Sequence, residues 1–412
     1  MPETTVGPGL AETAEDPVRT DPLAAADRAA QWLRRAEAVA GHLAPGAGRR
    51  DREGTAPVAE IRLLKEAGLV TLLGPVEYGG GGQDWPLAYR VVRTVAAADA
   101  SIGTLLAHHY VWLWIAEFIG TDEKIQHIGE VATRARWFFS GSDRPRSAPL
   151  VISDTGGDML FDGRLERALG HQVSDITMLE GFPEDGEVPV SALAMSNHER
   201  LHFEPEPAEF GLRSVAAGTV VANRANIPWT GALGHVDKTF VPRVYNTFLT
   251  PTLRLARANV LIGTAAGALR AAEEYLRCQW SDAPPSVSAA DVSAGVYGAL
   301  TARLWAVQAL ADAVGEESGE LHARRRRVSA EERGRHAVRV AALAEQAAEA
   351  ADEITGGVFR AVGATGARAA GGLDRFWRDV QALRVHEPAT DHRRTVGRHV
   401  LRGETPEPTW YA

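Results

Sequence analysis

The sequence predicts an α+β protein in which a middle antiparallel β domain lies between two helical domains. Apolar residues recur with helical spacing up to about residue 134, short β-rich segments follow, and alanine-rich helical sequence continues to about residue 399. The order along the chain is therefore α, β, α. The predicted divisions are a disordered lead (1–21), an N-terminal α domain (22–134), a middle β domain (135–250) and a C-terminal four-helix-bundle domain (251–412).

Length, composition and charge narrow the class of protein. The 412 residues, 45% hydrophobic and 24% charged, are typical of a globular protein with a large buried core. A net charge of −9 gives no basic field for nucleic acid, and no apolar run reaches the ~18 residues of a membrane span. The single cysteine, Cys278, excludes an internal disulfide and a thiolate metal cluster, so no metal site is expected. We therefore expect a cytoplasmic protein whose partners include neither nucleic acid nor a membrane.

The N-terminal part is predicted to begin with a disordered lead and to continue as helices. Residues 1–21 are rich in Pro, Glu, Thr and Asp, and they lack the basic and apolar runs of a signal peptide. Beyond them, the spacing of apolar residues predicts four helices: Ala24 to Ala40, Val58 to Glu66, Pro86 to Ala98 and Ile102 to Ile119.

The last of these helices carries one polar residue on its apolar face. Positions 102, 105, 106, 109, 112, 113, 116 and 119 form the stripe, and His109 is its only polar member. A buried neutral imidazole must find a hydrogen-bond partner or take part in a reaction, so His109 is either a satisfied core histidine or a functional group. His108 and Tyr110 fall to the sides of the stripe and are weaker candidates.

The middle part of the sequence predicts β-strands, and the C-terminal part predicts helices. Glycine, proline, aspartate and asparagine interrupt four β-rich segments, Leu150 to Ser153, Met159 to Phe161, Val188 to Met195 and Gly218 to Ala222. Alanine-rich sequence suited to close helix packing then predicts helices over Thr252 to Gln279, Ala289 to Ala313, Ala330 to Gly356 and Arg375 to Val385.

A histidine beside a carboxylate follows the last predicted helix. His386 and Glu387 precede Pro388, which ends that helix, and basic residues such as Arg378 and Arg384 lie just before them. Nearby arginines would hold Glu387 ionised, whereas burial would raise its pKa into the range of a useful base. The stretch is therefore either a site where proton chemistry is shielded from water or a capped helix end with surface ion pairs.

Several motifs, in this order along the chain, resemble those of the acyl-CoA dehydrogenase superfamily. Within that family the sequence is most similar to the flavin-dependent monooxygenase branch, of which the dibenzothiophene monooxygenases are typical. The resemblance runs from about Pro22 to Thr405. The segments that carry it are Pro75 to Gly80, Ala96 to Gly103, Gly356 to Phe359, Gly363 to Gly366 and Leu373 to Asp379.

The resemblance implies a fold, an activity and partners. Members of the branch take reduced flavin from a separate reductase and use oxygen to oxygenate a small molecule, so the cofactor performs the difficult chemistry. We therefore expect reduced FMN or FAD as cofactor and a hydrophobic or aromatic substrate, in secondary metabolism. The resemblance also implies a homotetramer.

The resemblance implies roles for particular residues. His386 matches the histidine near the reactive flavin edge, and His109 matches the helix histidine on the substrate side, with Tyr110 and Trp112 beside the substrate. Ser142 falls where the branch has asparagine, and Leu169 falls where it has a flavin-facing serine. The positions expected to contact the cofactor are Arg277, Ser142, Gly170, Gly363 and Gly366.

Two other functions remain open at this point. In the dehydrogenase branch the base is a glutamate eight residues after an Arg-Asp pair, and Glu387 stands eight residues after Asp379. Pro388 and Ala389 follow this glutamate where dehydrogenases have Gly and Thr, which favours oxygenation over desaturation. Leu169 removes a hydroxyl that would face the flavin, which allows a third reading, a flavin-free acid/base enzyme or binding protein on the same scaffold.

Overall fold

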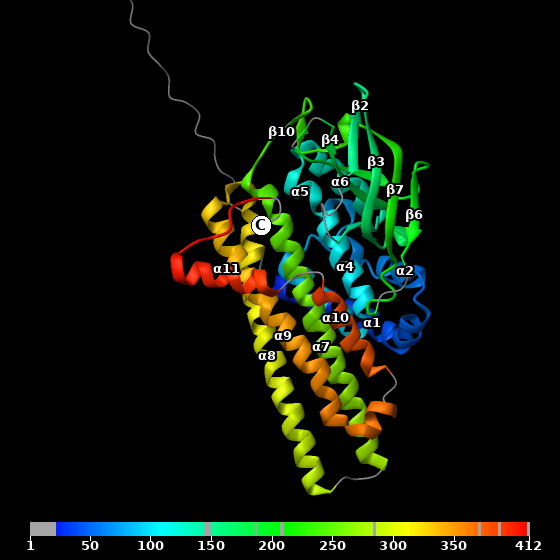
Figure 1. Ribbon diagram of the computed structural model, residues 1–412, viewed down its shortest axis with the longest axis vertical. Coiled ribbons are helices and arrows are strands. Elements are labelled where there is room, and N and C mark those ends of the chain that lie inside the picture. Colours follow the sequence, from blue (N-terminus) through cyan, green and yellow to red (C-terminus); the bar gives the residue numbers. More distant parts are fainter. Residues whose placement is uncertain are drawn as a thin grey trace, which may run out of the picture.

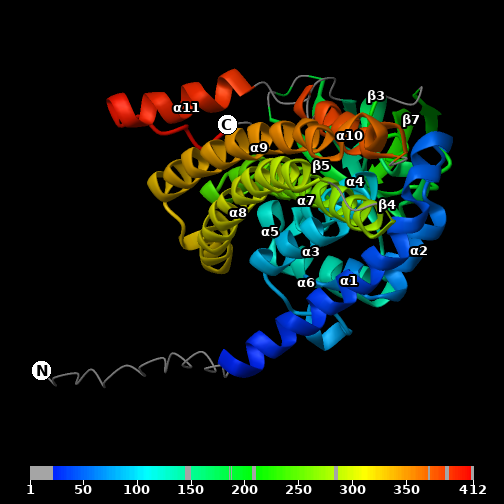
Figure 2. The same cartoon turned by 90° about the horizontal axis from the view of Figure 1, so that it is seen from below.

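Along the chain, a β-sheet region lies between two helical regions, in the order that the sequence predicts (Figure 1). The computed structural model describes residues 22–143, 150–184, 186, 188–206, 210–282, 286–369, 372–385 and 389–409. The sheet lies at the top of Figure 1, and the long C-terminal helices extend below it. Seen from below, α7, α8 and α9 run side by side, and α1 lies beside α3 among the N-terminal helices (Figure 2).

The N-terminal region contains one helix that is buried almost along its whole length, α4, which packs against α3, α7 and β1. The bounds are α1 Pro22–Glu53, α2 Val58–Glu66, α3 Trp85–Ala98, α4 Ala100–Leu113, α5 Ile115–Ile119 and α6 Asp122–Ala135. Two 3-10 turns, η1 Leu69–Thr71 and η2 Val76–Tyr78, connect α2 to α3. The predicted single helix over 102–119 is thus two helices, because the backbone at Trp114 turns out of the helix (ψ −2°).

The middle region is a mixed sheet, whereas the sequence predicts an antiparallel one. The bounds are β1 Phe139–Ser142, β2 Leu150–Asp154, β3 Asp158–Leu169, β4 Ile176–Pro183, β5 Val190–Met195, β6 Leu201–Pro205, β7 Ala217–Pro228, β8 Ala232–Leu233, β9 His235–Val236 and β10 Thr239–Phe240. The strand order is β6-β7-β3-β1-β4-β5-β8, with β2 against β3 and β4. Strand β4 runs parallel to β1 and β2, and the other pairs are antiparallel. Alternating apolar patterns do not encode strand direction, so this part of the prediction was wrong.

The C-terminal helices are longer than predicted. The bounds are α7 Leu249–Asp282, α8 Val287–Arg324, α9 Ala330–Ala369, α10 Leu373–Val385 and α11 Ala389–Arg402. The remaining 3-10 turns are η3 His171–Val173 and η4 Trp229–Gly231 in the β region, η5 Val244–Phe248 before α7 and η6 Arg325–Arg327 after α8. Helix α11 packs against α9, and its far end extends to the left of the bundle in Figure 1. Among the described helices, none is both long enough and apolar enough to cross a membrane.

Glycine allows α7 to lie directly against α3. Gly263 of α7 faces the Arg93 carbonyl so closely that a Cβ would overlap it, and Ala96 fills the adjacent space. Small residues at a helix crossing bring two backbones together and extend the buried area. This contact therefore fixes how the N-terminal helices sit on the C-terminal ones.

Buried charged residues join the three regions. Arg50, near the end of α1, pairs with Asp99 at 2.9 Å, and Arg378 of α10 pairs with Asp51 at 2.6 Å. Asp99 also caps α4, because its carboxylate accepts from backbone N–H groups in the first turn of that helix. Both arginines have a second acidic partner, Glu60 for Arg50 and Asp374 for Arg378, so each pair is part of a small network of charges.

A second carboxylate of α10 holds the β region. Asp379 Oδ1 accepts a hydrogen bond from the backbone N–H of Leu212 at 2.6 Å. Gly211 lies against the carbonyl of Arg378 with no room for a side chain. We call the set formed by Arg50, Asp51, Asp99, Arg378 and Asp379 the polar junction.

Substitution of Gly263 tests the helix crossing. We expect Gly263→Ala to lower the free energy of unfolding by about 1–3 kcal/mol, because the added methyl must push α7 away from α3. Gly295→Ala, in a part of α8 where a Cβ meets nothing within 4 Å, is the matched control and should be neutral or slightly stabilising. Chemical denaturation measures both, and equal values for the two variants would contradict the crossing described above.

The polar junction predicts a pH dependence of stability. Burial raises the pKa of Asp379 to about 7, against the opposing effects of Arg375 and the Leu212 amide. The folded state therefore holds this proton more tightly than the unfolded chain, and stability falls as pH rises from about 4 to 7. Asp379→Asn keeps an acceptor for Leu212 and removes the titration, so it should gain up to about 4 kcal/mol relative to wild type over that range. Denaturation at pH 5 and pH 8 measures the gain, and parallel curves for the two proteins would contradict it.

Candidate active site

One face of α4 meets the end of β1 and the start of α7. Trp112 packs on Gly141, where a Cβ would lie 2.7 Å from the indole ring. One turn earlier on the same helix, His108 interacts electrostatically with Asp143, which follows β1, and with Arg257 of α7. Residues four apart share a helix face, so His108 and Trp112 point to the same region.

His108 and Trp112 have buried polar atoms without partners. His108 Nδ1 and Trp112 Nε1 form no hydrogen bond with any described residue, and both side chains are only 2% exposed. Burial, reinforced by Arg257, lowers the pKa of His108 to about 3, so the imidazole is neutral. Buried polar atoms are nearly always hydrogen-bonded in folded proteins, so these two atoms make His108 and Trp112 candidates for contact with a ligand.

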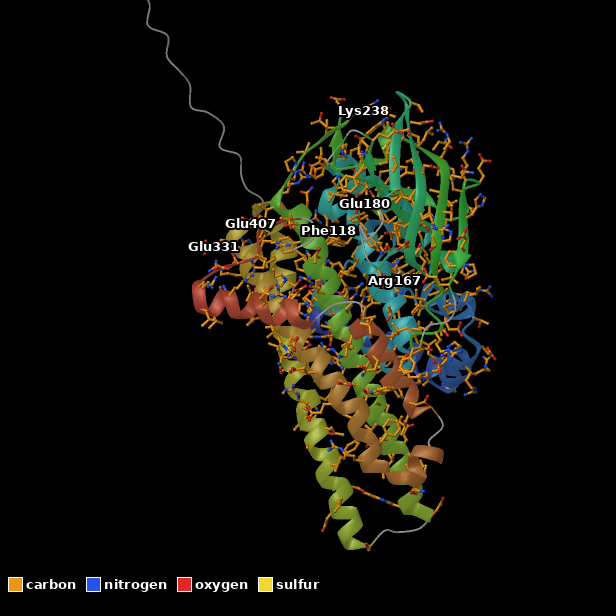
Figure 3. The ribbon with its side chains drawn as sticks, viewed as in Figure 1. Phe118, Arg167, Glu180, Lys238, Glu331 and Glu407 are labelled. Carbon is orange, nitrogen blue, oxygen red and sulfur yellow. The ribbon has the colours of Figure 1, made fainter. Side chains whose placement is uncertain are left out.

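A salt bridge fixes the end of β1 beside His108. Arg167 Nε lies 3.0 Å from the carboxylate of Asp143, and its Nη2 makes a second bond of 3.0 Å. Burial alone would raise the pKa of Asp143, but the bond from Arg167 and the nearby Arg257 lower it, so the carboxylate is ionised. Arg167 has a φ of 51° at an irregularity of β3, which turns its side chain toward Asp143. Figure 3 shows Arg167 at the end of the sheet nearest α4.

Arg257 connects this face of α4 to an arginine-lined cavity. It donates a hydrogen bond to the carbonyl of Asp143, and it lines a cavity of about 270 Å³ between α7, α9, α10 and α11. Arg254 and Arg384 also line this cavity, and Arg384 pairs with Asp352 at 2.6 Å. The rest of the wall is mainly apolar: Ala258, Leu261, Ala344, Ala348, Leu383 and Val385. The cavity therefore suits a ligand with an apolar body and an anionic group.

The predicted catalytic pair follows directly after a wall residue of this cavity. Val385 ends α10 and lines the cavity, and His386 and Glu387 come next in the chain. His386, Glu387 and Pro388 lie outside the described residues. Their predicted roles therefore stay predictions.

His109 is buried as predicted, but its two ring nitrogens are occupied. Nε2 bonds the carbonyl of Val70 at 2.8 Å, and Nδ1 accepts from the backbone N–H of Phe139 at 3.0 Å. The ring stacks on Phe138, and burial lowers its pKa to about 4, so it is a neutral structural group. No nitrogen of His109 is left for a substrate, whereas the neighbouring His108 has one.

The two predicted substrate residues lie on different sides of α4. The Tyr110 hydroxyl donates to the carbonyl of Leu69 at 2.7 Å, so it faces η1 rather than β1. Burial raises its pKa well above the ordinary value. Trp112 lies on the same side as His108, next to Gly141. Only Trp112 is therefore placed to contact a ligand of this site.

The predicted cofactor residues fall into two places. Ser142 donates to the carbonyl of Glu166 at 2.9 Å, and Gly170, with φ 73°, packs against Leu105 of α4. Both are therefore close to the face of α4 described above, and each has a structural reason for its residue type.

The other three cofactor residues lie along the helices, away from the cavity. Arg277 is 77% exposed and pairs with Glu273 at 2.6 Å, and its 20-residue separation from Arg257 along α7 amounts to about 30 Å. Gly363, at a kink of α9 with φ 67°, is about 22 Å from Ala348 on the same basis. Gly366 follows it, and its surroundings lie outside the described residues. The chain therefore does not bring Arg277 or Gly363 to the cavity.

The structure adds residues that the sequence prediction missed. Arg254 and Arg257 stand three apart in an otherwise apolar part of α7, and this spacing places both on one helix face. That pattern could have marked them as a functional pair. His108 was passed over because the prediction assumed one buried face, whereas α4 is buried on all sides.

Comparison with known proteins agrees with this architecture. Residues 31–133 match the acyl-CoA dehydrogenase N-terminal domain and residues 255–390 match the acyl-CoA dehydrogenase C-terminal domain. The dibenzothiophene monooxygenase of Rhodococcus qingshengii is 30% identical over 87% of this chain and 90% of its own. A probable FMNH2-dependent monooxygenase of Pseudomonas putida is 24% identical, over 96% and 99%. The complex of TdsC, a dibenzothiophene monooxygenase of Paenibacillus sp. A11-2, with FMN and indole superposes with a TM-score of 0.85 at 25% identity, covering 93% and 100%.

The fold and these similarities establish that the chain belongs to the acyl-CoA dehydrogenase superfamily. This confirms the predicted fold class. Within the superfamily the chain belongs to the flavin-dependent monooxygenase branch, and it is a monooxygenase of that type. The desaturase alternative is weaker, since the relatives above are monooxygenases.

The residues present fit a flavin at this site. A flavin carries a largely apolar ring system and an anionic phosphate, and the cavity offers an apolar wall together with arginine side chains. The arginines of the cavity match the negative charge of a flavin phosphate. Leu169 is buried at the position where the branch has a flavin-facing serine. This substitution does not remove the arginines that line the cavity.

The contrast between the two histidines can be measured. His109→Phe leaves the Val70 carbonyl and the Phe139 amide buried without partners, so it should cost about 1–3 kcal/mol of stability. His108→Phe breaks no hydrogen bond to a described residue and should change stability by less than about 1 kcal/mol. Thermal unfolding of both variants decides this, and a larger loss for the His108 variant would reverse the assignment.

Proposed function

We propose that this protein uses reduced FMN, supplied by a separate flavin reductase, to add one oxygen atom to an uncharged aromatic or otherwise hydrophobic small molecule. The observation that carries the proposal is the pair of unpartnered polar atoms on His108 and Trp112 beside an arginine-lined cavity. The second oxygen atom of O₂ leaves as water, so the reductase must supply two electrons in each turnover.

FMN is favoured over FAD by two observations. The relatives at 24% identity or more whose names include a flavin are named with FMN or its reduced form, whereas XiaF, named with FADH2, is only 17% identical. The cavity of about 270 Å³ is at the small end for a ligand site, and its arginines would hold a single phosphate group.

The residues of this chain have separate tasks in the proposed reaction. The bound reduced flavin supplies the oxygen-activating chemistry. Arg254 and Arg257 hold the anionic part of the cofactor, and the apolar wall of the cavity excludes water. His108, being neutral, offers Nδ1 as a hydrogen-bond partner rather than as a charge. His386, which follows the cavity residue Val385 in the chain, keeps its predicted role in proton exchange as part of this proposal.

The substrate class follows from the site rather than from any one relative. A neutral imidazole and an indole on α4 suit an uncharged ring that stacks and accepts few hydrogen bonds. The indole complex of TdsC supports this class. We retain secondary metabolism, a homotetramer and a cytoplasmic location as proposals.

A reconstituted assay tests the function. Purified protein with FMN, NADH, a flavin reductase and oxygen should oxygenate indole, used as a probe, and mass spectrometry after ¹⁸O₂ labelling should find one labelled atom in the product. His108→Ala should lower turnover roughly 10-fold or more with FMN affinity nearly unchanged, and Arg257→Ala should weaken FMN binding. Arg62→Ala, an exposed position of α2, is the control.

The outcomes separate the candidate functions. No FMN binding together with no oxygen uptake above the reductase alone would refute the proposal and favour the flavin-free alternative. Bleaching of bound flavin by an acyl thioester, lost in Glu387→Gln, would instead support the dehydrogenase reaction.

A further inference from the structure

A second cavity lies at the other end of α10 from the candidate active site. It has a volume of about 630 Å³ and lies between α1, the end of α3, the second half of α7 and the start of α10. Its α10 residue Arg375 is eight positions before Leu383, which lines the first cavity, so about 12 Å of helix separates them. No described residue lines both cavities.

The lining of the second cavity is strongly basic. Four arginines line it, Arg49, Arg52, Arg270 and Arg375, against one described acidic residue, Glu274. Neither Arg52 nor Arg270 makes an ion pair or hydrogen bond with a described residue, whereas Arg49 pairs with Glu53 at 3.5 Å. A protein of net charge −9 has many acids with which to neutralise surface arginines. Two arginines without acidic partners at one cavity therefore indicate an anionic ligand.

Buried polar groups of the same cavity also lack partners. Arg375 is only 8% exposed, and its Nε makes no hydrogen bond with a described residue. Its Nη1 makes one long bond, 3.4 Å, to the carbonyl of Ala98. The hydroxyl of Tyr275 is buried and equally unpartnered in the described structure. The N–H of Arg375 and the O–H of Tyr275 are hydrogen-bond donors, so a ligand that pairs with them must supply acceptor atoms.

The donors and charges of this cavity define the ligand. We propose that the cavity binds the phosphate or pyrophosphate group of a phosphorylated small molecule. Arginine forks match phosphate oxygens in pairs, and the hydroxyl of Tyr275 would donate to a third oxygen. The ring of Phe376, over which Arg375 lies at 4.2 Å, forms an apolar wall for the organic part of the ligand.

Calorimetric titration with inorganic phosphate, pyrophosphate and ADP tests this site. Pyrophosphate and ADP should bind the wild-type protein, and Arg52→Ala and Arg270→Ala should each weaken binding roughly three- to tenfold. Glu274→Gln removes the one described acid of the lining and should strengthen binding roughly two- to fivefold, an effect that a structural role would not produce. Arg34→Ala, an exposed α1 position outside the cavity, is the matched control.

Each result bears on the proposal. Tighter binding of ADP than of pyrophosphate would identify a nucleotide ligand, and equal affinities would identify recognition of the phosphates alone. Absence of binding at millimolar concentrations, or the same affinity in all variants with unchanged unfolding temperatures, would overturn the site. Displacement of pyrophosphate by FMN, with FMN affinity lost in Arg270→Ala, would show a part of the flavin site and overturn a separate one.

Discussion

The structure depends on a buried set of charges where its three regions meet. Arg50 of α1 pairs with Asp99, which precedes α4, within the N-terminal region. Arg378 of α10 pairs with Asp51 of α1, so this largely buried ion pair connects the C-terminal region to the N-terminal one. Asp379, next to Arg378, binds the backbone of the β region at Leu212. Loss of Asp379 would leave the buried N–H of Leu212 without its partner, and loss of Arg378 would leave Asp51 without its partner, which is more costly than losing a surface ion pair.

The polar junction also places the candidate site. Asp99 caps α4, and nine residues later the same helix presents His108 to the end of β1. Asp379 anchors α10, whose last residue, Val385, lines the arginine-lined cavity. Helices α4 and α10, which each contribute to the site, are therefore both held at the polar junction. The lengths and packing of these two helices set the distance between His108 and Val385.

The sequence contained most of the fold but only part of the site. Helical and strand periodicity gave the order of the regions, yet strand direction has no periodic signal, so the parallel pairing of β4 could not be predicted. Periodicity also selected His109 over His108, because it assumes one buried face, whereas α4 is surrounded on all sides. Which imidazole keeps an unused nitrogen depends on the loop carbonyl of Val70 and the strand amide of Phe139, which are distant in sequence. Arg277 matched a motif, but a motif does not report that its side chain faces solvent.

The distribution of charge in the site limits what it can bind. His108 is held neutral by burial and by Arg257, so any group resting on α4 meets hydrogen-bonding atoms and aromatic surface without a formal charge. Positive charge lies on the adjoining wall, on Arg254 and Arg257 of α7, and Arg257 also acts on His108. A neutral face on α4 beside a basic wall on α7 favours an uncharged ring next to an anionic cofactor.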